Sequence, residues 1–341
     1  MELIQLIESG HYLDEFNKEH VSYRKYPDKN LMIVKRKYNS KYSKDKPWLN
    51  YCRGLVIDYK LHKIVFIPPV KSKEILQYEK YTEQFDTSTL LMDGTMINLF
   101  WYNECWNIST RGNIGCTNKW DKHNSFKELF KECSVNLDIN SLNNEYTYSF
   151  VMRHKKNKII LPILTNELIL VEVYHNLEKL EILPENEGYK QINIINQTKD
   201  SFIKGYTTFK EGIRYKWISN EYKYVQTIVP TTNNELLNYL IIRKNNNISN
   251  YLRYFPEKKF KYKQFQEKLY NLTNIIYEYY KNVFIYKTYE KNDIPFKLRP
   301  SVYELHKLYL QGKEAISFNI MKDYMSTIEP KRIRFMFSIL K

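Results

Sequence analysis

Glycine and cysteine are both scarce in this chain, which has 341 residues with 9 glycines and 4 cysteines. Phosphate-cradling loops need several closely spaced glycines, so a glycine-rich phosphate loop is not expected. The cysteines all fall in the first half of the chain, form no C-x-x-C pair and lie far from the histidines. A zinc site is therefore not expected, and free thiols in a reducing compartment are the simple interpretation.

Long apolar segments are missing as well. The first residues, MELIQLIESG, are acidic and lack the basic start of a secretory signal peptide. The most apolar region, residues 159–173, is interrupted by the polar Thr165-Asn166-Glu167, so it does not predict a membrane-spanning helix. We therefore expect an intracellular, cytoplasmic protein without membrane association, of a kind that a virus could encode.

Positive charge is abundant. Lys+Arg total 53 against 38 for Asp+Glu, a formal net charge of +15. Such a balance favours polyanionic partners, above all RNA or another nucleic acid. The same excess could follow from the Lys, Asn, Ile and Tyr bias of an AT-rich genome, in which case the lysines are only solvated surface residues. Both interpretations stay open on composition alone.

The first two thirds of the chain are dominated by strand patterns. Residues 1–50 combine a short helical start with a Lys/Tyr-rich loop, and strand follows strand from Cys52 to about Trp120. One strand pair surrounds residues 59–62, and another turns at Asn103-Glu104. The patterns further predict strands within 145–163, 167–175 and 190–194, and helices over 121–143 and 195–212.

After about residue 230 the pattern becomes helical. Apolar residues recur at helical spacing, and Pro256, Pro295, Pro300 and Pro330 punctuate the helices. The sequence thus predicts an α+β domain with antiparallel sheets over residues 1–230 and a helical domain over 231–341.

Seven short segments follow one another in a recognisable order. They are CRGLVID (52–58), IPPVKSKE (67–74), MDGTMINLFW (92–101), WNISTRG (106–112), YTYSFVMRHKKNKIILP (146–162), LVEVYH (170–175) and EGIRYK (211–216). This order resembles ATP-dependent RNA ligases of the phage type, in the covalent nucleotidyltransferase superfamily. The resemblance covers about residues 40–230 and implies a nucleotidyltransferase domain, an ATP-grasp-like ligase fold. The helical part resembles the extra C-terminal domain of such ligases.

The central family motif, Lys-x-Asp-Gly, is incomplete here. In the family its lysine attacks the α-phosphate of ATP, with help from Mg²⁺, to give a lysyl-AMP. This chain has Leu91 at the lysine position, followed by Asp93, Gly94 and Thr95. Leucine has no lone pair with which to form a phosphoramidate. The resemblance therefore implies a nucleotide pocket that has lost its nucleophile.

Other family positions are partly retained. By resemblance, Arg53 and Lys71 contact phosphate, Glu211 helps to hold the metal ion, and Lys216 is the first of two phosphate-binding lysines. Ile218 stands at the second of those lysine positions, and Val151 replaces a family glutamate. Apolar residues at these positions and at the nucleophile position predict a partly filled pocket.

Each of these residues also has a plainer interpretation. Asp93-Gly94 could be an ordinary hairpin turn. Arg53 could pair with Asp58 at a strand edge, and Lys71 could be a solvated loop residue. Glu211 could be a turn or helix-end glutamate.

Three hypotheses for the function remain. The first is a catalytically inactive, RNA-ligase-like protein that retains nucleic-acid or nucleotide binding. The second is an active ligase or nucleotidyltransferase, using ATP and Mg²⁺, in which Lys71 or Lys73 replaces the missing nucleophile. The third is a structural or interaction protein that reuses the fold. Leu91 and Val151 speak against the second hypothesis, whereas Arg53, Asp93 and Glu211 speak against the third.

Overall fold

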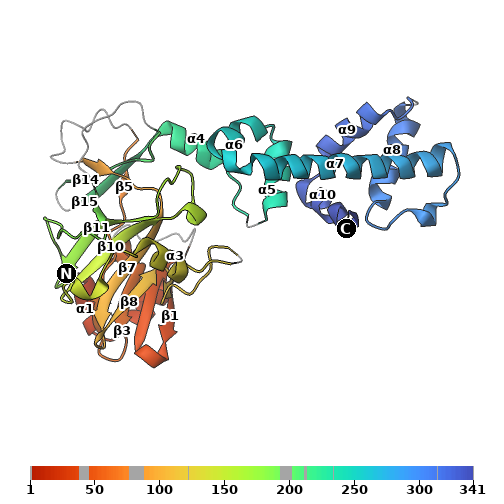
Figure 1. Ribbon diagram of the computed structural model, residues 1–341. Helices are drawn as coiled ribbons and strands as arrows, with labels where there is room; N and C mark the ends of the chain where they lie inside the picture. The colour runs from red at the N-terminus through yellow and green to blue at the C-terminus, as the bar shows by residue number, and fades with distance from the viewer. Residues whose placement is uncertain are drawn as a thin grey trace. The chain divides into compact units, whose positions relative to one another are not determined.

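The computed structural model describes residues 2–37, 46–76, 88–121, 123–192, 202–210, 213–232, 234–312 and 314–340. It divides the chain into two compact units, Met1–Lys223 and Tyr224–Lys341. Figure 1 shows strands in the first unit and helices in the second. The predicted division at residue 230 falls just after helix α4 (Asn220–Ile228), whereas the structure divides the chain within that helix.

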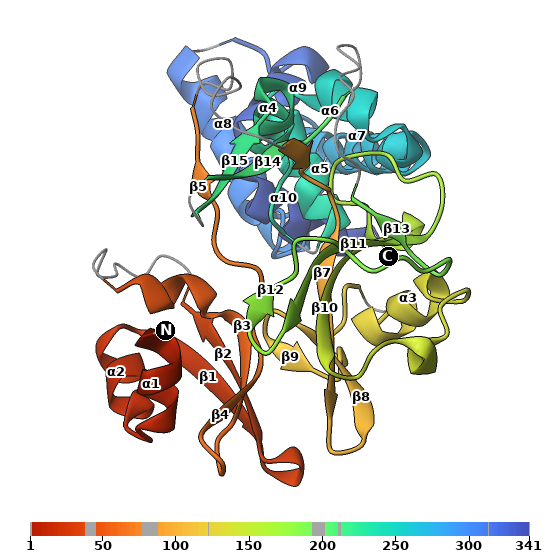
Figure 2. The ribbon, with the colours of Figure 1, turned by 90° about the vertical axis from the view of Figure 1, so that its left-hand side faces the viewer.

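The first unit begins with two short helices and a four-stranded antiparallel sheet (Figure 2). The strands pair in chain order. These elements are α1 (Glu2–Glu8), α2 (Tyr12–Lys18), β1 (Val21–Tyr26), β2 (Leu31–Arg36), β3 (Arg53–Asp58) and β4 (Lys63–Phe66). The strand pair predicted around residues 59–62 is confirmed as β3 and β4.

Strand β2 of this sheet is buried on both faces, since its successive residues point to opposite sides and its first four are all buried. Met32 and Val34 pack with the apolar side chains of α1 and α2. Leu31 and Ile33 pack instead with Phe100 of the second sheet. The prediction of a loop after the short helical start is wrong for β1 and β2. The apolar run of β2 is a strand buried on both faces.

The second sheet has seven strands in the order β12-β11-β10-β7-β8-β9, with β13 parallel to β11. The strands are β7 (Thr95–Tyr102), β8 (Cys105–Thr110), β9 (Asn113–Ile114), β10 (Tyr146–Arg153), β11 (Glu167–His175), β12 (Glu178–Lys179) and β13 (Lys190–Gln191). The predicted turn at Asn103-Glu104 is confirmed, with both residues at positive φ. The predicted strands within 145–163 and 167–175 are confirmed as β10 and β11.

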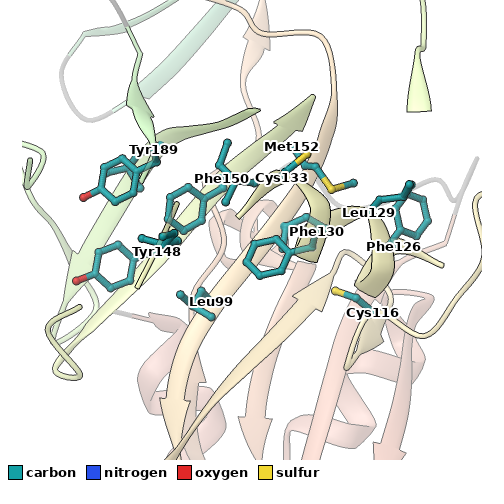
Figure 3. Close-up of a cluster of buried hydrophobic side chains, with 14 of the residues drawn as sticks. Leu99, Cys116, Phe126, Leu129, Phe130, Cys133, Tyr148, Phe150, Met152 and Tyr189 are labelled. Atoms are coloured by element: carbon teal, nitrogen blue, oxygen red, sulfur yellow. The ribbon is translucent and has the colours of Figure 1, made fainter. Parts of the chain in front are cut away.

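Helix α3 (Phe126–Cys133) covers one face of the second sheet. It starts at a capping box, in which Ser125 accepts from the Glu128 N–H and Glu128 accepts from the Ser125 N–H. Leu129 and Phe130 then pack against Phe150 and neighbouring strand residues (Figure 3). The helix is shorter than the predicted span of 121–143.

A third, smaller sheet has the order β5-β15-β14-β6. Its strands are β5 (Lys73–Glu74), β6 (Ser88–Leu90), β14 (Gly205–Lys210) and β15 (Ile213–Ile218). Thr207 of β14 pairs with Lys216 on one side and with Thr89 on the other. The predicted helix over 195–212 is therefore wrong at residues 205–210.

The second unit is helical, as predicted. Its helices are α5 (Glu235–Lys244), α6 (Ile248–Tyr254), α7 (Lys259–Tyr280), α8 (Arg299–Gly312), α9 (Phe318–Thr327) and α10 (Pro330–Met336). The long helix α7 packs with α5, α8 and α9, and α10 packs with α5. None of the helices described has the length and apolar character needed to cross a bilayer.

Candidate functional site

A row of polar side chains crosses the face of the second sheet opposite α3. Glu172, Ser149, Asn98 and Ser109 lie directly opposite one another on four neighbouring strands. All four are buried. The Asn98 amide donates to Ser109 Oγ, and Ser149 Oγ donates to Asn98 Oδ1, both at 3.4 Å. One face of the sheet is thus apolar, and the other carries hydrogen-bonding groups.

Glu172 anchors an arginine to this polar row. Tyr174 donates to Glu172 Oε2 at 2.7 Å. Arg214 Nη1 of β15 lies 3.3 Å from Oε1, at ion-pair distance but without the geometry of a hydrogen bond. Burial, followed by the Glu172 charge and hydrogen bond, raises the pKa of Tyr174. Glu172 therefore holds Arg214 between the second and third sheets.

Three further arginines lie near Arg214. Arg36 ends β2, Arg53 begins β3, and Arg111 lies in the turn between β8 and β9. Gly54 permits this approach: it has φ +114°, and a Cβ there would lie 3.1 Å from the Arg111 Cα. Burial, then the charges of Arg111, Arg214 and Arg36, lower the pKa of Arg53 to about 10. Arginine still carries its charge at neutral pH, so four like charges share this region.

Lysines extend the same positive region. Burial lowers the pKa of Lys216, and the charges of Arg53, Lys204 and Lys71 lower it further. Glu74 acts in the opposite direction, with its carboxylate 4.0 Å from Lys216 Nζ. We refer to the seven basic residues together as the cation cluster: Arg36, Arg53, Lys71, Arg111, Lys204, Arg214 and Lys216.

Asp93 is buried and fully engaged by the protein. Its Oδ2 accepts from the backbone N–H groups of Ile160 at 3.0 Å and Leu161 at 2.9 Å. Its Oδ1 accepts from the Tyr222 hydroxyl at 2.5 Å and lies 3.3 Å from Lys204 Nζ. Burial and the contact with Asp93 raise the pKa of Tyr222. Asp93 thus ties the start of β7 to the 160–161 segment and to α4.

Gly94 has an equally plain structural role. A Cβ at this position would lie 2.5 Å from the Met152 carbonyl oxygen and 2.7 Å from Val151 Cγ1. Glycine therefore allows the chain to enter β7 in close contact with β10. Asp93 and Gly94 lie between β6 and β7, which belong to different sheets, so they do not form a hairpin turn.

The three apolar residues at family positions differ in burial, and the predicted filling of a pocket stays a prediction. Val151 is buried in β10, whereas Leu91 and Ile218 are only half-buried. The Leu91 N–H donates to the Gly205 carbonyl at 2.8 Å and so prolongs the pairing of β6 with β14. Leu91 and Asp93 are not part of a strand.

Two lysines and one glutamate remain among the residues that the sequence singled out. Lys71 is in the cation cluster, and Lys73 is exposed in β5. Glu211 lies outside the described residues, so its metal role stays a prediction. Among the described residues no cluster of three carboxylate, thiol or imidazole groups could hold a metal ion.

Sequence reasoning missed Lys204, Arg214 and Glu172. Lys204 immediately precedes β14, in a segment that was predicted to be helical. Glu172 is a lone carboxylate in the apolar strand sequence LVEVYH. Burying an unpaired carboxylate has a high free-energy cost, so this pattern could have predicted a buried partner for Glu172.

The sequence matches no family model and no curated protein. Among the solved structures that match is one titled "Putative ATP-dependent DNA ligase from Aquifex aeolicus". Its identity to this chain is 15%, the match covers 80% of this chain and 76% of that chain, and the TM-score is 0.42.

Proposed function

We propose that this protein is an RNA-ligase-like protein that binds single-stranded RNA through its cation cluster and does not form a lysyl-AMP. The observation that carries the proposal is the convergence of Arg53, Lys71 and Lys216. They are far apart in the sequence, yet the charges of Arg53 and Lys71 both lower the pKa of Lys216. Their arrangement favours a ligand with several negative charges.

Three carboxylates of the described residues lie close to cations of the cluster, and one of them, Asp93, is 3.3 Å from Lys204 Nζ. Glu172 is at ion-pair distance from Arg214, and Glu74 is shared by Lys216 and Lys223. The depressed pKa values of Arg53 and Lys216 reflect the free-energy cost of keeping these charges partly buried and close together. Bound phosphate groups would relieve both causes, because they supply negative charge and hydrogen-bond acceptors.

The surroundings of Asp93 argue against nucleotidyl transfer. Leu91 cannot act as a nucleophile, and the oxygens of Asp93 already accept three hydrogen bonds. The retained chemistry is therefore phosphate binding, for which the cations fit RNA or the phosphates of ATP.

RNA binding over a salt series tests the proposal. Phosphate contacts release counterions, so affinity for a single-stranded RNA should fall steeply with salt. Arg53→Ala with Lys71→Ala should reduce the log–log slope by about 1.4, at ~0.7 per lost contact with a single strand. Binding should vary little with RNA sequence, because contacts to phosphate carry no base information. Lys18→Ala with Lys29→Ala, which lies outside the cluster, serves as the charge-matched control.

A double variant that has the RNA affinity and the salt slope of the wild type would contradict the proposal. The +15 charge would then be a property of the surface at large, and the interaction-protein hypothesis would lead. If ATP and RNA bind with equal affinity per phosphate group, the protein is instead a nucleotide-binding protein.

Incubation with labelled ATP and Mg²⁺ or Mn²⁺ separates this proposal from an active enzyme. We expect no covalent protein–AMP adduct when the protein is denatured and separated under non-acidic conditions, in which a phosphoramidate would survive. One observation favours the alternative: Lys204 places an amine beside the motif, 3.3 Å from Asp93 Oδ1. An adduct that disappears in Lys204→Ala, but persists in Lys73→Ala, would establish Lys204 as a displaced nucleophile.

A further inference from the structure

A groove of about 640 Å³ lies within the helical unit, where α5, α6, α7 and α9 meet. Figure 1 shows α5 and α6 alongside the first half of α7. The cations that line the groove come from three helices: Arg243, Lys259, Lys263 and Lys322. No aspartate or glutamate is among the described residues that line it. The groove is therefore a second positive site, separate in the chain from the cation cluster.

Two lysines immediately beside the groove form ion pairs, unlike the described cations that line it. Lys244 forms an ion pair with Glu329, and Lys258 pairs with Glu235 at 2.5 Å. Within the part of the chain that the structure describes, none of the four groove cations forms such a pair. The unit thus neutralises cations next to the groove and leaves those inside it available to an external anion.

Helix α7 presents a regular stripe to the groove. Lys259, Lys263, Gln266 and Tyr270 recur at spacings of three and four residues, which places them on one face of the helix. The stripe is roughly 17 Å long at ~1.5 Å per residue. At ~3.4 Å per nucleotide, that length corresponds to about five stacked nucleotides of one strand.

Tyrosines supply the apolar part of the lining. Tyr239 and Tyr262 are buried, with ring centroids 5.2 Å apart in an edge-to-face contact. Tyr270 is 53% exposed and makes an edge-to-face contact with Phe318 at 5.6 Å. A half-exposed ring beside lysines can stack with an unpaired base, while the lysines contact the neighbouring phosphates.

We propose that this groove is a binding site for a short stretch of single-stranded RNA. The proposal takes its ligand class from the proposed function, but its residues are independent of the cation cluster. Arg243, Lys259, Lys263 and Lys322 contact the phosphates, and Tyr270 stacks on a base. An acidic peptide would match the charge, but it would not exploit the half-exposed Tyr270 ring that lines the groove together with the cations.

The test is photo-crosslinking of the full-length protein to a 4-thiouridine-containing RNA, with the adducts mapped by mass spectrometry. We expect an adduct on the α7 peptide that contains Tyr270. It should fall at least tenfold in Arg243→Ala/Lys259→Ala/Lys263→Ala. Four phosphate contacts also predict that the affinity of the wild type for this RNA falls more than tenfold when salt rises from about 50 to about 200 mM.

Two further variants keep the result interpretable. Lys259→Ala/Lys263→Ala changes only exposed residues, so it tests the groove even if loss of the half-buried Arg243 disturbs folding. Lys244→Ala/Lys258→Ala removes two neighbouring lysines that are already paired, and it should leave the adduct within twofold of wild type.

The outcomes separate the two proposals. Loss of the α7 adduct in the groove variants, with wild-type binding in Arg53→Ala/Lys71→Ala, would support the groove and overturn the cation cluster. An α7 adduct that is absent, or equally strong in all variants, would overturn the groove and leave the cluster to its own test. If poly-glutamate of equal charge blocks the adduct as well as unlabelled RNA does, the groove is an acidic-peptide site.

Discussion

Asp93 adjoins the cation cluster, but the two differ in their electrostatic surroundings. Asp93 is surrounded by hydrogen-bond donors and a cation, whereas the cluster brings cations close to one another. The carboxylate of Asp93 accepts three hydrogen bonds and lies 3.3 Å from the ammonium of Lys204. In the cation cluster, Arg53 and Lys216 instead have pKa values lowered by burial and by other cations. The charge of Asp93 is thus balanced within the protein, whereas the cations of the cluster destabilise one another, and the proposed phosphate ligand would offset this repulsion.

This difference distinguishes a residue that stabilises the fold from residues that are proposed to bind a ligand. A residue at a motif position, Asp93, has become a structural link between β7, the 160–161 segment and α4. Residues whose sequence context is less distinctive, such as Lys204 and Arg214, belong to the proposed binding region. The comparison predicts that changes at Asp93 act on folding, whereas changes in the cluster act on ligand affinity.

The largest expected effect is that of Asp93→Ala on stability. The change leaves two backbone N–H groups and the Tyr222 hydroxyl without their acceptor in a buried site. Each buried unsatisfied group costs about 1–3 kcal/mol, so the free energy of unfolding should fall by about 3 kcal/mol or more. Denaturant titration measures it. Tyr222→Phe, which removes a single hydrogen bond, should cost only about 1 kcal/mol. Equal stability of Asp93→Ala and wild type would contradict the structural role.

An intermediate effect is expected for Arg53→Met. Replacing a half-buried cation among other cations should leave the unfolding free energy in low salt unchanged or slightly higher. Phosphate at about ten times its dissociation constant should stabilise the wild type by about 1.4 kcal/mol. The melting temperature would then rise by roughly 3–5 °C. Arg53→Met should lose at least half of that rise.

Thermal melts with and without phosphate, at constant ionic strength, measure this effect. Chloride at matched ionic strength serves as the control for general screening. A substantial fall in stability on Arg53→Met without phosphate would show that the arginine is paired internally, and the contrast with Asp93 would disappear.

The smallest effect at neutral pH concerns Cys52, the residue before Arg53. Burial raises the pKa of its thiol to about 12, and the nearby charge of Arg36 offsets only part of that rise. The unfolded thiol ionises near pH 9, so this thiol's contribution to stability is constant below pH 9. The contribution is lost as pH rises from 9 towards 12, by up to about 1.4 kcal/mol per pH unit.

Alkylation of the native protein at pH 9 follows this thiol directly. Labelling of Cys52 should be roughly a hundredfold slower than labelling of the exposed Cys105, because the thiolate is the reactive form. Rapid labelling of Cys52 would mean that the positive field of the cluster outweighs burial.

The strands of the second sheet were well predicted because their sequence pattern is local. The predicted turn at Asn103-Glu104 joins β7 to β8, and β10 and β11 are long apolar strands. Strand β1 was missed for the opposite reason. Its residues are largely exposed, so VSYRKY has no alternation of apolar and polar residues, and it becomes a strand by pairing with β2. Strand β14 likewise depends on its partners β6 and β15.

The sequence by itself determined the two-part organisation, the strand pairs with local turns, the excess of cations and the absence of lysine at residue 91. Only the tertiary structure decided how the retained residues are used. Asp93 accepts a hydrogen bond from Tyr222, which lies 129 residues further along the chain. The pairing of β15 with β5 brings Lys216 near Lys71, and the charge of Arg53, from a different sheet, also acts on Lys216. Hydrogen bonds and charge–charge interactions depend on distance in space, and the chain order does not specify that distance for residues on different sheets.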